Sequence, residues 1–356
     1  MPVPAQNQQY ENFIIRYKQN TQGGFDYESD ETFQIVNDLF GILYIPMKEV
    51  PELELSSYSY SSIPRCYTYM DTGVLSASGV TRLHNHPYLK LQGKGTLVAV
   101  IDSGIDYLHP AFHNGVQSKI LSIWDQTLEG GADGRIPFGR EFSRQQIEQA
   151  LASENPWEIV PSSDTNGHGT RSAATAAGYR IEKENFCGAA PEAELVIVKL
   201  KQAKNYLRDF YLLPRDTDIF QEDDIMLAIS YVLCIAQEQQ MPLSICIGLG
   251  TSMGAHQGEG PLNEYINSIA AFTQNAVSVP AGNEGTARHH YLGEFGQNDT
   301  EDTVELRVGD RESNRGFMTE FWGDSPGSYY MTIQSPTGEK LSVSTSLKTV
   351  SYTHLT

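Results

Sequence analysis

Between residues 79 and 285 the chain alternates short apolar runs with longer segments of helical spacing. Three runs are apolar almost throughout: 97–101, 195–200 and 243–247. Such runs are typical of strands that are buried on both faces. Two segments have helical spacing, 224–240 and 262–274, and the first has an apolar face of Ile225, Ala228, Ile229, Val232 and Ala236. The alternation predicts an α/β fold, with a parallel sheet flanked by helices.

The hydrophobic pattern divides the chain into four parts. The first is a small α+β unit, in which residues 13–17 and 41–45 predict strands and a polar stretch rich in Ser and Tyr follows. The last is a short segment that fits nothing before it and that we interpret as a non-native tail. The predicted parts are an N-terminal unit (1–75), an α/β domain (76–295), the start of an inserted β domain (296–349) and the tail (350–356).

The third part is predicted to begin an antiparallel β domain of jelly-roll type. Residues 304–308 alternate strictly between polar and apolar, which indicates a half-buried strand. Further strands are predicted at 317–322 and 329–333, and the Pro and Gly of 335–338 supply a turn. These strands are too few to close a β domain.

Charge narrows the classes of partner. The 356 residues include 44 acidic and 25 basic side chains, which give a formal net charge of −19. Nucleic acid and anionic membrane surfaces are not expected as partners, because both would repel such a chain. No apolar run approaches the roughly 18 residues of a membrane span. The N-terminus has neither the basic nor the apolar region of a Sec-type signal peptide.

Two short segments contain the candidate chemistry. Asp102 ends the apolar run 97–101, and His168 lies between Gly167 and Gly169 at the start of a small-residue helix. A serine hydroxyl needs a neighbouring base to attack an amide, and a histidine held against a buried carboxylate supplies one. Aspartate before histidine is the chain order of the subtilisin version of the Ser-His-Asp triad. Taken singly, a strand-end aspartate is often only a cap, and a histidine is often structural.

Four sequence blocks surround and follow these residues. They are Asp-Ser-Gly-Ile-Asp at 102–106 with His109-Pro110, Asn-Gly-His-Gly-Thr at 166–170, Cys-Gly-Ala-Ala-Pro at 187–191 with Val-Lys-Leu at 198–200, and Ala-Gly-Asn-Glu-Gly at 281–285. In residue type and order they resemble the subtilisin (subtilase, S8) family of serine proteases. More narrowly, residues 221–226, residues 250–256 and the β insert resemble the clostridial germination-protease branch.

The resemblance implies a role for each matching position, in a peptidase whose partner is a protein or peptide substrate. Asp102 would orient His168, which would act first as general base and then as general acid. Asn283 would donate its side-chain amide to the oxyanion. The implied substrate-binding positions are Gly248, Leu249, Gly250 and Gly282.

The nucleophile is expected to be missing. In the family it follows the block that contains Asn283, and no Gly-Thr-Ser-x-Ala occurs between that block and Thr356. Ser252 lies in a similar Gly-Thr-Ser-Met-Gly, but this motif precedes Asn283 and directly follows the substrate-binding strand. The chain is therefore interpreted as an N-terminal fragment of a serine endopeptidase, without activity of its own.

Two departures from the family pattern affect the expected site. Ala111 follows His109-Pro110 where many subtilisins have a calcium-binding aspartate, which puts the strong calcium site in doubt. Gly248 replaces the usual serine of the substrate-binding strand. The cysteines form no CxxC pair, so a zinc site is not expected; they are Cys66, Cys187, Cys234 and Cys246. No cofactor is expected, and only calcium stays open.

The N-terminal unit resembles a subtilase propeptide, which adds an internal partner. Residues 65–74 would be its inhibitory tail, and self-cleavage would fall within 69–78. The alternative is a fixed subdomain that is never cut. The sequence does not settle the compartment; a cytoplasmic or spore-associated location in a bacterium is favoured over classical secretion.

Two other functions stay open beside the peptidase. A pseudoprotease would use the same fold to bind a partner or regulate an active relative, although intact Asp102, His168 and Asn283 count against it. A nucleotide-binding α/β domain fits less well. The turn after the first core strand lacks G-x-G-x-x-G, and no G-x-x-x-x-G-K-[ST] occurs.

Overall fold

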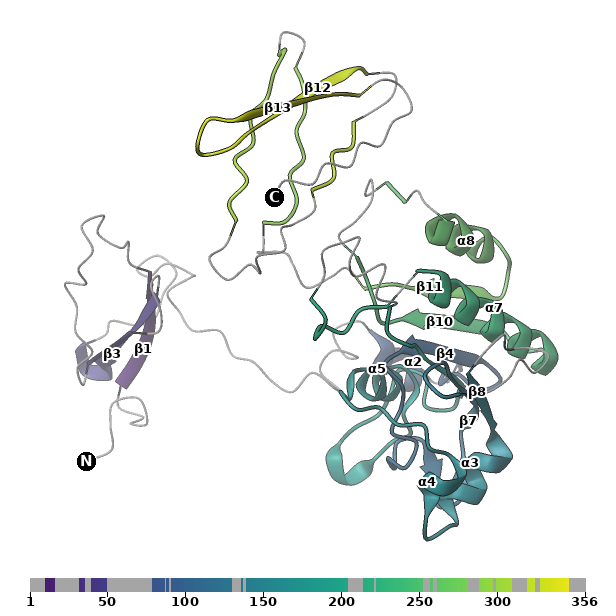
Figure 1. Cartoon of the computed structure of the whole chain (residues 1–356). Helices are drawn as coiled ribbons and strands as arrows, with labels where there is room; N and C mark the ends of the chain where they lie inside the picture. The colour runs from purple at the N-terminus through teal and green to yellow at the C-terminus, as the bar shows by residue number, and fades with distance from the viewer. Residues whose placement is uncertain are drawn as a thin grey trace. The chain divides into compact units, whose positions relative to one another are not determined.

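The computed structural model forms two compact units, Met1–Met70 and Asp71–Thr356 (Figure 1). It describes residues 10–16, 32–35, 40–49, 79–86, 88–89, 91–129, 136, 139–203, 214–220, 222–251, 257–258, 261–280, 288–296, 299–308, 319–323 and 327–345.

The first unit contains a small antiparallel sheet in the order β1-β3-β2. Its elements are β1 (Tyr10–Arg16), β2 (Phe33–Ile35), β3 (Phe40–Pro46) and a 3-10 turn, η2 (Met47–Glu49). Both strands predicted for this region are confirmed, and they pair with each other from Tyr10 opposite Pro46 to Arg16 opposite Phe40. Pro46 ends β3, as expected of a residue that cannot donate to a ladder.

The second unit is built on a six-stranded sheet in the order β11-β10-β4-β9-β7-β8 (Figure 1). The strands are β4 (Leu97–Asp102), β7 (Ile120–Asp125), β8 (Arg140–Ser143), β9 (Glu194–Lys199), β10 (Leu243–Ile247) and β11 (Asn275–Ser278). Neighbouring strands run parallel, except that β8 is antiparallel to β7. The predicted α/β fold with a parallel sheet flanked by helices is confirmed.

Different helices cover the two faces of this sheet. The helices are α2 (Val80–His84), α3 (Arg144–Leu151), α4 (Pro156–Ile159), α5 (His168–Ala177), α7 (Glu222–Gln239) and α8 (Pro261–Ala270), with a 3-10 turn, η3 (Glu182–Glu184). A short hairpin of β5 (His113–Asn114) and β6 (Gln117–Ser118) precedes β7.

The side chains of β4 alternate between two buried clusters, one on each face. Leu97, Ala99 and Ile101 pack with α7, including all five members of its predicted apolar face, and this cluster is called the α7 face. Val98 and Val100 pack with Ala173 and Ala177 of α5 and with Ile147 and Ala150 of α3, and this cluster is called the α5 face.

The sequence patterns did not predict β7 or β8, and they made α8 too long. Lys119 precedes β7 and Ser122 interrupts it, so its pattern is less apolar than that of β4. Both residues are nevertheless buried. Residues 271–274 form turns where the helix was expected to continue.

The predicted strand at 304–308 is wrong, because the structure gives these residues no strand. Val304, Leu306 and Val308 are 51–53% exposed, and no strand among the described residues pairs with them. An alternating pattern forms a stable strand only beside a hydrogen-bonding partner.

The strand predicted at 329–333 and the turn after it are confirmed, and the structure adds a partner strand. β12 (Tyr329–Gln334) pairs antiparallel with β13 (Lys340–Thr345). The turn between them closes with a 2.9 Å bond from the Gly338 amide to the Ser335 carbonyl, and Gly338 has a φ of +92°. In the strand predicted at 317–322, the described residues 319–322 form no strand, and residues 350–356 lie outside the described ranges.

Candidate active site

Asp102 is the last residue of β4, a central strand of the sheet, and it is fully buried. The carboxyl ends of parallel strands are where open α/β sheets form their sites. The backbone amide of Ser103 donates to Asp102 Oδ1 at 2.7 Å. This bond and the burial hold the carboxylate at the edge of the sheet.

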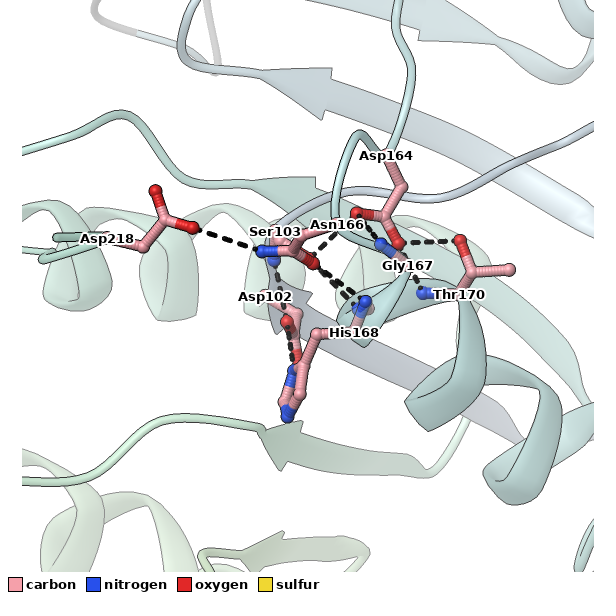
Figure 2. A network of polar contacts seen from close by, with 9 residues as sticks. Asp102, Ser103, Asp164, Asn166, Gly167, His168, Thr170 and Asp218 are labelled. Atoms are coloured by element: carbon pink, nitrogen blue, oxygen red, sulfur yellow. Dashed lines mark hydrogen bonds and ion pairs between the residues drawn. The ribbon is translucent and has the colours of Figure 1, made fainter. Parts of the chain in front are cut away.

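His168 is the first residue of α5, and its ring lies against this carboxylate (Figure 2). Nδ1 of His168 and Oδ1 of Asp102 are 2.7 Å apart. An ionised carboxylate can only accept, so Nδ1 carries the proton and Nε2 is left as the basic nitrogen. The Asp102 side chain is 1% exposed and that of His168 is 49% exposed. The carboxylate is therefore shielded from solvent, whereas the imidazole is accessible.

Glycines allow the strand and the helix to approach this closely. Gly167 has a φ of +75°, in the left-handed region that favours glycine, directly before the helix. A Cβ on Gly169 would lie 2.2 Å from the Gly104 carbonyl oxygen and 3.1 Å from Cβ of Asp102. The glycines on both sides of His168 are thus required by the backbone path that brings His168 to Asp102.

The expected substrate-binding strand also reaches this pair. Gly248 follows β10, and its amide donates to the Ile101 carbonyl at 3.3 Å. A Cβ on Gly248 would lie 1.8 Å from Asp102 Oδ2 and 3.2 Å from Cε1 of His168. Gly248 therefore contacts the dyad directly, while Leu249 is partly exposed and Gly250 is exposed. Oδ2 of Asp102 is buried and has no hydrogen-bond partner among the residues that the structure describes.

Three other expected positions fall outside the described residues: Ser252, Gly282 and Asn283. Ala111, at the doubtful calcium position, is fully buried on the α5 face. Within the described ranges, no group of three or more His, Cys, Asp or Glu side chains could hold a metal ion.

A cysteine next to the site is not set up as a nucleophile. Cys246 of β10 is partly buried, and burial, with the nearby charge of Asp102, raises the pKa of its thiol. A raised thiol pKa keeps the sulfur protonated, whereas a reactive cysteine needs the thiolate. The chemistry of this edge is therefore that of the imidazole and carboxylate.

Residues 93–211 match the sequence profile described as the subtilase family, Peptidase_S8. The chain is 30% identical over 197 residues to an intracellular serine protease of Paenibacillus polymyxa, which is 54% of this chain and 43% of that protein. It is 29% identical over 125 residues to subtilisin-like protease SBT1.4 of Arabidopsis thaliana, which is 30% of this chain and 16% of that protein. The solved CspB protease of Clostridium perfringens aligns with a TM-score of 0.62 at 26% identity, over 77% of this chain and 52% of that one.

The chain is subtilisin-like in sequence and fold. The matched range contains both Asp102 and His168, so the sequence match and the hydrogen-bonded pair support each other. The chain spans 43% and 16% of the two curated relatives and 52% of the solved structure. Among the described residues, no helix combines the length and the apolar character needed to cross a membrane.

A further carboxylate, that of Asp164, lies two residues before the block at 166–170, and the sequence patterns did not reveal its role. Oδ1 of Asp164 accepts hydrogen bonds from the Ser103 hydroxyl at 2.9 Å and the Gly167 amide at 3.1 Å. Oδ2 accepts from the Thr170 amide at 2.9 Å and the Thr170 hydroxyl at 2.7 Å (Figure 2). The fixed spacing of Asp164, Gly167 and Thr170 is a possible sequence signal, because a carboxylate just before a helix start can cap its free amides.

Asn166 is a second such residue. Its side-chain oxygen accepts from the His168 amide at 2.8 Å, and its side-chain nitrogen lies 3.4 Å from Asp218 Oδ2 (Figure 2). An Asn two residues before a helix start often accepts from the backbone in this way. Asn166 thus helps to fix the backbone at the histidine.

Proposed function

We propose that this chain is the N-terminal part of a subtilisin-like serine endopeptidase, in which Asp102 and His168 work with a serine from beyond Thr356. The observation that supports this most is the 2.7 Å bond between a buried carboxylate and the Nδ1 atom of a half-exposed imidazole. That arrangement leaves Nε2 facing outward as a base for a hydroxyl.

In the proposed reaction, His168 Nε2 removes the serine proton as the serine oxygen attacks the substrate carbonyl carbon. The imidazolium gives this proton to the amine nitrogen as the C–N bond breaks, and the acyl group stays on the serine. Water then attacks the ester and passes one proton to His168, which returns it to the departing serine oxygen. One water is consumed for each peptide bond that is hydrolysed.

Asp102 would act on the imidazole and not on the substrate. Its carboxylate fixes the tautomer with the proton on Nδ1 and stabilises the imidazolium that forms during the reaction. Because Asp102 is fully buried, its charge is not screened by water, and among the described residues its side chain accepts hydrogen bonds from His168 and the Ser103 amide. We expect Asp102→Asn to lower kcat by about 10⁴-fold, as in the general triad template.

Gly248, Leu249 and Gly250 would pair with the backbone of an extended substrate, which would add to the edge after β10. Support for this comes from Gly248, which lies close to both members of the dyad. Asn283 would donate its side-chain amide to the oxyanion, and Gly282 would belong to the same wall of the site.

A fluorophosphonate probe, which reacts with activated serines, tests this proposal. We expect the full-length protein to be labelled, and His168→Ala to abolish the labelling. We expect the 356-residue chain alone to remain unlabelled. Labelling of this chain that disappears in Ser252→Ala would identify Ser252 as the nucleophile and overturn the assignment to a later serine. A full-length protein that stays unlabelled but folded would favour the pseudoprotease.

The finer family assignment and the N-terminal unit belong to the same proposal. Similarity to the CspB protease supports the clostridial germination-protease branch. The name of the Paenibacillus relative, an intracellular serine protease, supports a cytoplasmic over a classically secreted location, and a spore-associated one remains part of the proposal. The unit before residue 75 would act as a propeptide that is cut within 69–78. Mass spectrometry of the full-length protein should find this cut, and His168→Ala should prevent it; an active, uncut protein would contradict it.

A further inference from the structure

The carboxylate of Asp164 joins the two elements that meet at the dyad. One oxygen accepts from Ser103, which directly follows Asp102 at the end of β4. Both oxygens together accept from Gly167 and Thr170, which flank His168 at the start of α5. Asp164 makes no hydrogen bond with the side chain of either Asp102 or His168, so its effect on them is indirect.

Ser103 completes the connection. Its hydroxyl donates to Asp164 and accepts from the Gly169 amide at 3.0 Å, while its own amide donates to Asp102 Oδ1 at 2.7 Å. A single residue thus contacts Asp102, Asp164 and the residue after His168. The distance between strand end and helix start is set by these bonds, because the glycines at this junction leave no side chains to set it by packing.

The charge of Asp164 suits this place. Burial raises the pKa of its carboxyl, but hydrogen bonds from the Thr170 hydroxyl and amide, the Ser103 hydroxyl and the Gly167 amide outweigh that effect. The net result is a pKa below its usual value, so the group stays ionised at neutral pH. A negative charge that accepts from amides at the helix N-terminus also interacts favourably with the helix dipole of α5.

We infer that Asp164 is a positioning residue for the dyad: it holds the end of β4 against the first turn of α5 so that His168 Nδ1 lies within hydrogen-bond distance of Asp102. The inference rests on the proposed function for its catalytic meaning, but the pairing itself exists in this chain without a nucleophile. The competing role is a simple helix cap, which would add stability without affecting the His168–Asp102 bond.

The decisive variant is Asp164→Asn in the 356-residue chain. Asparagine has nearly the same shape, but its NH₂ group cannot accept, so either Gly167 and Ser103 or Thr170 lose their acceptor. We expect the proton NMR resonance of the His168 Nδ1–H group to disappear or shift strongly, under conditions where backbone amide spectra show a folded chain. An unchanged resonance in a folded Asp164→Asn protein would overturn the inference.

Asp106→Asn is the matched control. Asp106 lies in the loop after β4 that also contains Ser103, and its carboxylate accepts from the Leu108 amide at 3.1 Å. Its backbone amide donates to the Thr170 hydroxyl at 2.9 Å, a bond that the substitution keeps, and its side chain makes no hydrogen bond with the described residues of α5. Its substitution should leave the Nδ1–H resonance in place. If both variants lost the resonance equally, the loss of any carboxylate that accepts from backbone amides here would have this effect. The specific role of Asp164 would then be refuted.

Ser103→Ala keeps the inference testable if Asp164→Asn does not fold. It removes the link to β4 and leaves the bonds from Thr170 and Gly167 to Asp164. The resonance should again shift or broaden, and an unchanged resonance would overturn the inference.

Kinetics of the full-length protein provide a second readout. In Asp164→Asn, kcat should fall by about 10²-fold, the size expected for a misplacement of about 1 Å, with little change in KM. Failure of the wild-type protein to react with a fluorophosphonate would refute the proposed nucleophile, but the NMR result would still stand or fall by itself. Unaltered kcat in the variant, with an active wild type, would refute the positioning role.

Discussion

The helices α7 and α5, which cover opposite faces of the six-stranded sheet, bury side chains of different size. On the α7 face the helix contributes branched residues, among them Ile225, Ile229 and Val232. On the α5 face the helix contributes only Ala173 and Ala177 to the buried cluster. The small residues allow the α5 backbone to reach the end of β4, where His168 meets Asp102. The α7 face, in contrast, mainly contributes buried apolar area to the core.

Gly169→Ala has the largest expected effect on the α5 face. The added Cβ would lie 2.2 Å from a backbone oxygen of Gly104, which cannot move without displacing the strand end that carries Asp102. We expect the dyad hydrogen bond to be lost and the free energy of unfolding to fall by more than about 4 kcal/mol, as for severe strain. Urea unfolding and the His168 Nδ1–H resonance would measure the two effects.

Gly250→Ala is the control for this substitution. Its added Cβ would have no neighbour within 4 Å, and its φ is not in the left-handed region. Its free energy of unfolding should change little. If both variants lost similar stability, close approach of α5 would not be the cause.

Ile229→Ala tests the α7 face. Ile229 is fully buried between α7 and the sheet, and its truncation should cost about 3 kcal/mol of unfolding free energy, within the range for a buried Ile. In contrast to Gly169→Ala, it should leave the Nδ1–H resonance of His168 unchanged. Leu227→Ala, on the same helix but 37% exposed, should cost less than half as much. A changed His168 resonance in Ile229→Ala would show that the two faces are not separable.

A buried charged group that no chain pattern predicted lies against α5. Lys119 is 2% exposed, and its Nζ donates to the carbonyls of Ala177 and Pro191 and lies 4.2 Å from the Tyr179 ring centre. Burial lowers the pKa of Lys119 from 10.5 to about 8, although Glu194 and Cys187 oppose the shift.

Lys119→Met should therefore change how stability depends on pH. A folded-state pKa below the unfolded value means that the folded chain binds fewer protons between about pH 8 and 10.5, so Lys119 makes stability rise with pH in that window. The full rise is up to about 3 kcal/mol, at 1.36 kcal/mol per pKa unit. Urea unfolding of both proteins at several pH values should show this rise in the wild type and not in the variant.

Lys183→Met provides the control, because Lys183 is exposed. This variant should keep the wild-type pH dependence. Identical pH profiles for Lys119→Met and the wild type would mean that the Lys119 ammonium is solvated.

Buried polar side chains such as Ser122 and Lys119 explain why some strands could be predicted from the sequence and others could not. β4, β9 and β10 are apolar on both faces, and their runs predicted them correctly. β7 was missed because Ser122 interrupts its run; in the structure this hydroxyl bonds with Tyr231, 109 residues away. A partner so distant in the chain leaves no local pattern.

The site shows the same limit. The pairing of Asp102 with His168 could be predicted, because each has its own local glycine context and the chain order is informative. The role of Asp164 could not, since it depends on Ser103, 61 residues earlier, being brought to the same helix start. At 304–308 the opposite happened. The local alternation is typical of a strand, but no strand among the described residues pairs with this segment.

Substitution of Gly248 has the smallest expected effect on stability. Gly248 follows β10, and its backbone lies as close to Asp102 and His168 as the backbone of α5 does. Its missing Cβ makes room for Asp102 Oδ2, a buried atom for which the described part of the chain supplies no hydrogen-bond donor. Gly248→Ala should cost about 1–3 kcal/mol of unfolding free energy, because the methyl group overpacks the carboxylate. Gly248→Ser adds the same Cβ together with a hydroxyl that can donate to Oδ2.

The informative quantity is therefore the difference in unfolding free energy between Gly248→Ser and Gly248→Ala. A hydrogen bond to a charged acceptor offsets about 1.5–3 kcal/mol, so the serine variant should be more stable than the alanine variant by about 1 kcal/mol or more after the hydroxyl has been desolvated. The His168 Nδ1–H resonance should weaken in Gly248→Ala and recover in Gly248→Ser. Equal stabilities in urea unfolding would mean that Oδ2 already has its full set of donors, and that glycine at this position serves the substrate strand and not the carboxylate.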